Sequence, residues 1–179
     1  MYLNGFETKR LNTRCLTVDD IPAWTEYFQD KVGTTFIPND TQLQPEERAA
    51  EWITITMDRY VTYGTGLQAL ITKDAGVLVG ICGVLRQEVK GKIEFEIGYH
   101  LLRRYWGMGY ATEAARRFRD YAFENNIAES LISIIHPLNF LSQNVAMRNG
   151  MKLSERGIIW RNREYDVYRI TRAEWELQR

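Results

Sequence analysis

The feature that most constrains the fold is a glycine-bearing junction between a strand-like and a helix-like segment. Residues 93–101 alternate in the manner of a strand, and residues 111–124 place alanine and aromatic side chains at helical spacing. Between them lies Trp106-Gly107-Met108-Gly109-Tyr110-Ala111. Such a turn leaves main-chain N–H groups unpaired at the positive end of a helix, which favours binding of a phosphate or pyrophosphate. Gly-x-Gly is also common where only turn geometry is needed, so the context of the junction must decide.

Strand and helix signals alternate before this junction. A short strand within residues 8–17 leads to a helix near 20–30, a turn at 38–40 and a second helix that begins at Pro45. Residues 67–72 and 77–86 then form a hairpin, and residues 93–101 add a third antiparallel strand. The order predicts an antiparallel meander ahead of the glycine-bearing turn.

The segments after the junction complete the sheet. Residues 131–135 form a buried strand parallel to the one before the helix, and a short helix near 141–149 ends at Asn149-Gly150. Two further strands cover 152–160 and 164–170. We therefore predict an α/β fold with a mixed, mostly antiparallel sheet of about seven strands flanked by helices, in a single domain over residues 1–179.

Composition excludes several function classes. Equal numbers of Lys+Arg and Asp+Glu, 23 each, give no positive field for nucleic acid. The chain has no apolar run of membrane-spanning length and no apolar leader, which predicts a cytoplasmic protein without membrane contact. Cys15 and Cys82 lie in no metal-binding or redox spacing, so we expect reduced core cysteines and no metal.

Known nucleotide-binding loops fit poorly. The Gly-Lys-Ser/Thr of a phosphate-binding loop is absent, and Thr112 stands where a dinucleotide fingerprint needs glycine or alanine. A nucleotide-dependent oxidoreductase is thus a weak alternative.

Four segments together resemble the GNAT superfamily of acetyl-CoA-dependent N-acetyltransferases, in particular the branch similar to the ribosomal-protein N-terminal (Rim-type) acetyltransferases. They are Glu96-Ile97-Gly98-Tyr99-His100-Leu101, residues 106–114, Asn139-Phe140-Leu141-Ser142 and Arg148-Asn149-Gly150-Met151. The resemblance covers nearly the whole chain and implies the GNAT fold.

The resemblance also implies where acetyl-CoA binds. Its pyrophosphate would lie on the main-chain amides of the loop formed by Trp106, Gly107, Met108, Gly109, Tyr110 and Ala111. Its pantetheine would pair like an extra strand with the sheet edge at Leu101 and Leu102, and would contact Asn139 and Ser142. Relatives commonly form homodimers, so a homodimer is a further expectation.

The implied reaction is direct transfer of the acetyl group to a primary amine in a ternary complex. The leading acceptor is a protein or peptide N-terminus. A small-molecule amine, such as an amino acid, polyamine or antibiotic, is the alternative within the enzyme class. A non-catalytic acyl-CoA-binding module is the alternative outside it.

Two positions depart from the usual family pattern. The family loop begins Arg/Gln-x-x-Gly-x-Gly/Ala, and the chain offers one frame from Arg104 and a second, favoured frame from Trp106. Many relatives carry a tyrosine general acid seven residues after the asparagine equivalent to Asn139, and Ala146 occupies that position here. Another group must protonate the CoA thiolate, or none does so directly.

Catalytic candidates follow from the chemistry of amine acetylation, which needs a base and an acid. Glu96 is the leading base, because it shares a strand face with Glu94 and Gly98 and resembles the acidic strand position of the Rim-type branch. Ser142 could bind CoA or protonate the thiolate, or simply support the start of its helix. His136 is a weaker base candidate, and an acyl-cysteine mechanism through Cys82 has little support.

Overall fold

The strand segments form one mixed seven-stranded sheet in a computed structural model that describes residues 2–38 and 42–178. The strand order is β1-β2-β3-β4-β5-β7-β6. Only β4 and β5 pair in parallel; the other neighbours are antiparallel. The strands are β1 (Leu11–Cys15), β2 (Leu67–Thr72), β3 (Leu78–Val89), β4 (Lys92–Leu101), β5 (Ser130–Ile135), β6 (Lys152–Trp160) and β7 (Arg163–Thr171). The predicted α/β architecture, the seven strands and the parallel crossover are confirmed.

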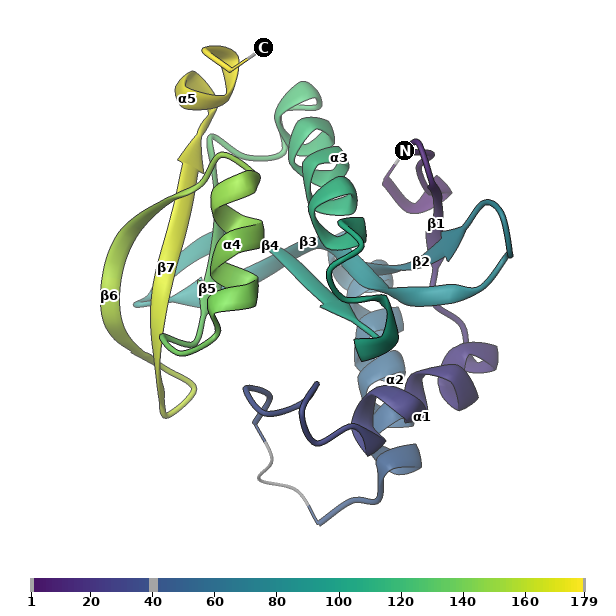
Figure 1. Ribbon diagram of the computed structural model, residues 1–179. Coiled ribbons are helices and arrows are strands. Elements are labelled where there is room, and N and C mark those ends of the chain that lie inside the picture. The colour runs from purple at the N-terminus through teal and green to yellow at the C-terminus, as the bar shows by residue number, and fades with distance from the viewer. Residues whose placement is uncertain (1, 39–41, 179) are drawn as a thin grey trace.

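Helices cover both faces of this sheet. Figure 1 shows α3 and α4 on one side and α1 and α2 on the other. Alternate residues of one strand serve the two layers: Leu70 packs with α3, and Ala69 with the helices opposite. The helices are α1 (Ile21–Gln29), α2 (Pro45–Tyr63), α3 (Tyr110–Glu124), α4 (Phe140–Arg148) and α5 (Arg172–Glu176), with 3-10 turns η1 (Tyr2–Asn4), η2 (Val18–Asp20) and η3 (Arg103–Tyr105).

Local sequence explains where the long helices begin. In α2, Pro45 occupies the first turn, Gln44 and Glu47 form a capping box, and Gly64 closes the helix in a left-handed conformation. In α3, Gly109 is the N-cap, with φ of 80°. A side chain at that φ would cost about 1–2 kcal/mol, so glycine is the residue that turns the chain into the helix.

The sheet splays between β4 and β5. β3 and β4 pair along their whole length, from Gly80 with Leu101 to Val89 with Lys92. In contrast, β4 and β5 are in register at Glu96 and Ile132. The two strands then separate toward their carboxyl ends, which leaves an opening beside the second half of β4.

Several expectations need correction or lie outside the described residues. Cys82 is buried, but Cys15 is only half-buried, and both are free thiols. The turn expected at 38–40 falls largely on undescribed residues. The short α5 was not predicted. No helix in the described part of the chain is long and apolar enough to cross a membrane.

Candidate active site

A cavity of about 960 Å³ lies at the splayed edge of the sheet. It receives residues from the glycine-bearing loop, from β4 and β5, from α2 and α4, and from the segment 32–38 that follows α1. The proposed cofactor residues that line it are Leu101, Trp106, Gly107, Gly109, Tyr110, Ala111, Asn139 and Ser142. Glu96, the proposed base, opens into the same cavity. The proposed cofactor residues and the proposed base therefore line the same cavity.

Both loop glycines adopt left-handed backbone angles. Gly107 has φ of 76° and Gly109 has φ of 80°. The indole Nε1 of Trp106 donates to the carbonyl of Leu101 at 2.9 Å, which ties the loop to the end of β4. The first main-chain amides of α3 have no intrahelical partners and lie at the wall of the cavity, an arrangement that favours an anion.

An ion pair behind the loop fixes its position. The carboxylate of Glu113, in the first turn of α3, accepts from Thr8 Oγ1 at 2.6 Å and from Arg10 N and Arg10 Nε at 2.7 Å each. Arg10 Nη1 also donates to the carbonyl of Met108 at 2.8 Å. Burial opposes ionisation of Glu113, but these hydrogen bonds hold the pKa of its carboxyl below the usual value. We call Arg10 and Glu113 the loop brace.

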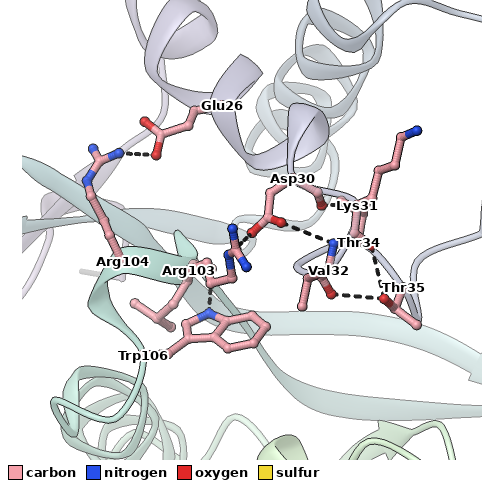
Figure 2. A network of polar contacts seen from close by, with 10 residues as sticks. Glu26, Asp30, Lys31, Val32, Thr34, Thr35, Arg103, Arg104 and Trp106 are labelled. Carbon is pink, nitrogen blue, oxygen red and sulfur yellow. Dashed lines mark hydrogen bonds and ion pairs between the residues drawn. The ribbon is translucent and has the colours of Figure 1, made fainter.

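The loop is also tied to α1. Figure 2 shows Arg104 next to Glu26 and Arg103 next to Asp30, with Trp106 beside them. The Arg103–Asp30 distance is 3.0 Å. These contacts border a second, smaller cavity of about 630 Å³. Arg104 thus lies outside the larger cavity as an accessory cation, consistent with the loop frame that begins at Trp106.

Two residues of the expected cofactor set are placed elsewhere. Leu102 is buried, borders the smaller cavity, and has its N–H bonded to Val79 and its C=O to Tyr105. Met108 is half-exposed, lies outside the cavity lining, and gives its carbonyl to Arg10. Hydrophobic strand sequence alone could not reveal that Leu102 turns away from the sheet edge after β4 ends.

Glu96 is a buried carboxylate at the cavity wall. Its Oε2 accepts from Gln87 Nε2 at 2.8 Å, and its Oε1 accepts from Ile134 N at 3.4 Å. Burial raises the pKa of Glu96 above its usual value, although these hydrogen bonds and the charges of Arg161 and Arg59 oppose the rise. A carboxyl group with a raised pKa is a stronger base than an ordinary glutamate, which suits it to accept a proton. Its neighbour on the same face, Glu94, is instead paired with Arg169 at 2.9 Å, outside the cavity.

His100 is a cavity residue that the sequence analysis did not single out. Its Nδ1 lies 3.0 Å from the hydroxyl of Tyr27, and its ring packs edge-on against Trp52, with centroids 5.1 Å apart. Burial lowers the pKa of His100 to about 4. The imidazole is therefore neutral at neutral pH and too weak a base to compete with Glu96. Strand alternation from Glu96 through Gly98 reaches His100, so the signal was present.

Trp52 of α2 also lines the cavity. Its ring contacts Phe28, with centroids 5.7 Å apart, as well as His100. Aromatic side chains thus form part of the cavity wall.

His136 is placed at the cavity without the geometry of a base. Its Nδ1 accepts a hydrogen bond from Leu138 N at 3.1 Å, and its ring packs on Phe36 at 4.8 Å. In the neutral imidazole the proton then resides on Nε2, which leaves that nitrogen without a lone pair to accept another.

The start of α4 carries Asn139 and Ser142. Asn139 Oδ1 accepts from Ser142 N at 3.2 Å, so the Asn139 side chain caps the start of α4. The hydroxyl of Tyr99 donates to the Ser142 carbonyl at 2.8 Å. Ala146 is fully buried in the core and lies outside the cavity lining, so position 146 supplies no acid.

A splayed sheet, an anion-binding loop at a helix start and a buried carboxylate in one cavity together define an acyl-transferase architecture. The family model described as an acetyltransferase (GNAT) domain matches residues 10–152. The chain belongs to the GNAT acetyltransferase family, and members of this family use acetyl-CoA. The resemblance to the GNAT superfamily seen in the sequence is confirmed.

Relatives match along most of the chain. An uncharacterized protein, YkkB, of Bacillus subtilis is 32% identical over 162 residues, which cover 90% of this chain and 92% of YkkB. The uncharacterized N-acetyltransferase p20 of Bacillus licheniformis is 26% identical, and the match covers 89% of this chain and 85% of p20. These matches support an acyltransferase.

Solved structures share the fold. An acetyltransferase of Agrobacterium tumefaciens superposes with a TM-score of 0.78 at 27% identity, covering 93% of each chain. RimL, described as a ribosomal L7/L12 alpha-N-protein acetyltransferase in complex with coenzyme A, superposes with a TM-score of 0.70 at 12% identity, covering 92% of this chain and 95% of RimL. At that identity, the likeness to RimL shows the fold alone.

Proposed function

We propose that this acetyltransferase moves the acetyl group of acetyl-CoA directly to a primary amine held in the cavity beside Glu96. The observation that carries the proposal is that the anion-binding loop and a buried carboxylate open into the same 960 Å³ space. A donor bound at one wall and an amine at the other could meet there without a covalent enzyme intermediate. Cys82 is fully buried, and burial raises the pKa of its thiol, which disfavours an acyl-cysteine route.

The proposed donor site uses main-chain groups. The amides of Gly107, Gly109, Tyr110 and Ala111 would hold the pyrophosphate, and the end of β4 at Leu101 would guide the pantetheine toward Asn139 and Ser142. Acetyl-CoA supplies the activated acetyl group. The loop brace keeps the amides in position before the donor arrives, which reduces the entropy lost on binding.

Glu96 is the proposed general base. The amine nitrogen forms a bond to the thioester carbonyl carbon, its proton passes to Glu96 directly or through water, and the C–S bond then breaks. The thiolate is protonated by Ser142 Oγ or by water, since Ala146 has no acidic group. A carboxyl with a raised pKa suits this role because its proton affinity lies closer to neutral pH.

The leading acceptor is a protein or peptide N-terminus, with a small amine as the alternative. Support for the peptide comes from the Rim-type segments of the sequence and from the description of RimL as an alpha-N-protein acetyltransferase. The aromatic wall formed by Phe28, Phe36 and Trp52 would pack against the first side chain of a peptide or the body of a small molecule.

Calorimetric titration with acetyl-CoA tests the donor half of the proposal. Gly107→Glu places bulk and negative charge at the proposed pyrophosphate site and should weaken binding by more than about tenfold. Gly76→Glu is the matched control, because Gly76 also has positive φ, and a Cβ at either glycine meets nothing within 4 Å. Equal affinities in the two variants would refute the placement of the cofactor.

Turnover tests the acceptor half. Wild-type protein should acetylate peptide amides at the α-amine, measured by mass increase and thiol release, and should show no acetylated protein when the amine is omitted. Binding of acetyl-CoA without turnover on peptides, amino acids and polyamines would contradict the enzymatic proposal and favour a non-catalytic acyl-CoA-binding module.

A further inference from the structure

We propose that the acceptor carries an anionic carboxylate close to its reactive amine, and that Arg59 and Arg161 bind this carboxylate. The inference rests on the proposed function and names the substrate class of the same cavity. It follows from two arginines on separate elements that border the cavity near Glu96.

Arg59 reaches the cavity from α2. Its side chain is half-buried, and its Nη1 donates to the carbonyl of Arg86 at 3.2 Å. Burial and the nearby charge of Arg161 lower the pKa of Arg59. Arg59 thus contacts Arg86, and Arg161 lies beside the next residue of β3, Gln87. Each guanidinium has N–H donors beyond these contacts.

Arg161 reaches the cavity from the turn between β6 and β7. Residues 161 and 162 both have positive φ, 49° and 61°, which is typical of a two-residue hairpin turn. The guanidinium lies 4.3 Å from the centroid of the Trp160 ring, and its Nη2 lies 3.5 Å from Gln87 Oε1. Trp160 is itself held by a bond from its Nε1 to the Glu88 carbonyl at 2.9 Å. Trp160 thus supports the exposed guanidinium of Arg161.

Gln87 connects this pair to the proposed base. Its Oε1 faces Arg161, and its Nε2 donates to Glu96 at 2.8 Å. The Arg161 guanidinium is thus linked through the side-chain amide of Gln87 to the carboxylate proposed to receive the amine proton.

Within the described part of the chain, neither arginine forms an ion pair with a carboxylate. The ion pairs of residues 2–38 and 42–178 all involve other side chains. Arg10, Arg103 and Arg169, by contrast, each form an ion pair with a carboxylate. The remaining charged residues that line the cavity are Arg48, Glu51 and Arg148.

The charge balance of the reaction favours an anionic acceptor. With Glu96 ionised, Arg59, Arg161 and Glu96 together carry one net positive charge. When Glu96 accepts the amine proton, that sum rises to two. A carboxylate on the acceptor offsets this change, and bidentate guanidinium contacts would also orient the amine.

Two kinds of acceptor offer this chemistry. A free α-amino acid carries its carboxylate on the carbon that bears the amine, and a peptide that begins with Asp or Glu carries one on the first side chain. Kinetic comparison of matched pairs separates them: L-alanine against L-alaninamide, and a tetrapeptide amide beginning with Asp against the same peptide beginning with Asn. Rates are compared at equal concentrations of unprotonated amine.

In at least one pair, we expect the anionic member to have a kcat/KM about fivefold or more above the neutral member. This ratio should fall toward one in the Arg59→Gln/Arg161→Gln double variant. Arg86→Gln is the matched control, since Arg86 is exposed, stacks on Tyr63 and lies outside the cavity lining. Higher salt should lower the wild-type ratio, because exposed guanidiniums are screened.

Ratios near one in both pairs, or a ratio that the double variant leaves unchanged, would overturn the inference while leaving acetyl transfer intact. A wild-type protein that neither binds acetyl-CoA nor acetylates any acceptor would instead contradict the proposed function, and with it this site. Calorimetry with acetyl-CoA on the double variant confirms that its donor site is folded.

Discussion

The hydroxyl of Tyr99 on β4 donates a 2.8 Å hydrogen bond to the main-chain carbonyl of Ser142 in the first turn of α4. Tyr99 therefore joins the strand that carries Glu96 to the helix that carries Asn139 and Ser142. Burial raises the pKa of the Tyr99 hydroxyl, so it remains a donor at neutral pH. The contact therefore links the strand of the proposed base to the helix of the proposed pantetheine site.

Removing this hydroxyl should loosen the donor site. Tyr99→Phe loses one neutral hydrogen bond, worth about 1 kcal/mol, and should raise the KM for acetyl-CoA about fivefold with a smaller change in kcat. Steady-state kinetics with varied acetyl-CoA measures the split. Tyr168→Phe is the control, because Tyr168 is a buried tyrosine that lies outside the cavity lining. A fall in kcat alone would contradict a positioning role and would point to proton donation by Tyr99.

Glu96→Gln should slow transfer while leaving the donor site intact. The amide keeps an oxygen to accept from Gln87 but cannot take a proton, so kcat should fall about 10²-fold or more. Affinity for acetyl-CoA should stay within about twofold of wild type by calorimetry. Glu94→Gln, which alters the ion pair with Arg169 outside the cavity, should retain kcat. If Glu96→Gln turns over at the wild-type rate, another group is the base.

The acid side of the pH profile provides a second test of Glu96. Because burial raises the pKa of this carboxyl, the rate should decline on acidification from a pH above the usual range of glutamate. The decline should be absent from the residual activity of Glu96→Gln, when both proteins are assayed at a constant concentration of unprotonated amine.

Local patterns predicted the elements of the fold because each segment carried its own signal. Alternation fixed β4, helical spacing fixed α3, and Asn149-Gly150 marked the end of α4. The glycine-bearing loop stood out because Gly107 and Gly109 meet a conformational need that other residues meet at a cost.

The contents of the cavity were harder to predict. The segment 32–38 has no hydrophobic period, yet it lines the cavity and places Phe36 on His136. The pairing of Arg10 with Glu113 and the approach of Arg161 to Gln87 join residues 103 and 74 positions apart in sequence. Such contacts depend on how the sheet twists and splays, which no local sequence window encodes.

His100 should make stability depend on pH in a defined window. Because burial lowers the pKa of the folded-state imidazole to about 4 from 6.5, the unfolded chain binds a proton first on acidification. The neutral ring thus contributes stability above pH 6.5 that is lost as the pH falls to about 4, by roughly 1–3 kcal/mol.

Urea unfolding of wild type and His100→Gln at several pH values measures this contribution. The difference in free energy of unfolding between the two proteins should shift in favour of the variant between pH 6.5 and pH 4. A difference that stays constant over this window would show that His100 titrates normally in the folded protein.

The loop brace should matter for cofactor binding more than for folding. Glu113→Gln removes the charge that holds Arg10 against the Met108 carbonyl, and this pair is only partly shielded, with side-chain exposures of 18% for Glu113 and 41% for Arg10. We expect a stability loss of about 0.5–1 kcal/mol at pH 7, since solvent screens such a pair. Because the folded-state pKa of Glu113 is depressed, this loss should shrink as the pH falls below the usual range of glutamate.

The freed loop must be ordered by the ligand, so the Kd of the Glu113→Gln variant for acetyl-CoA should rise about threefold to tenfold. Glu7→Gln is the matched control, because Glu7 forms an ion pair with Lys73 at 3.0 Å but is 80% exposed and distant from the cavity lining. If Glu113→Gln destabilises the fold yet binds acetyl-CoA with unchanged affinity, the ion pair supports the start of α3 without preparing the loop for its ligand.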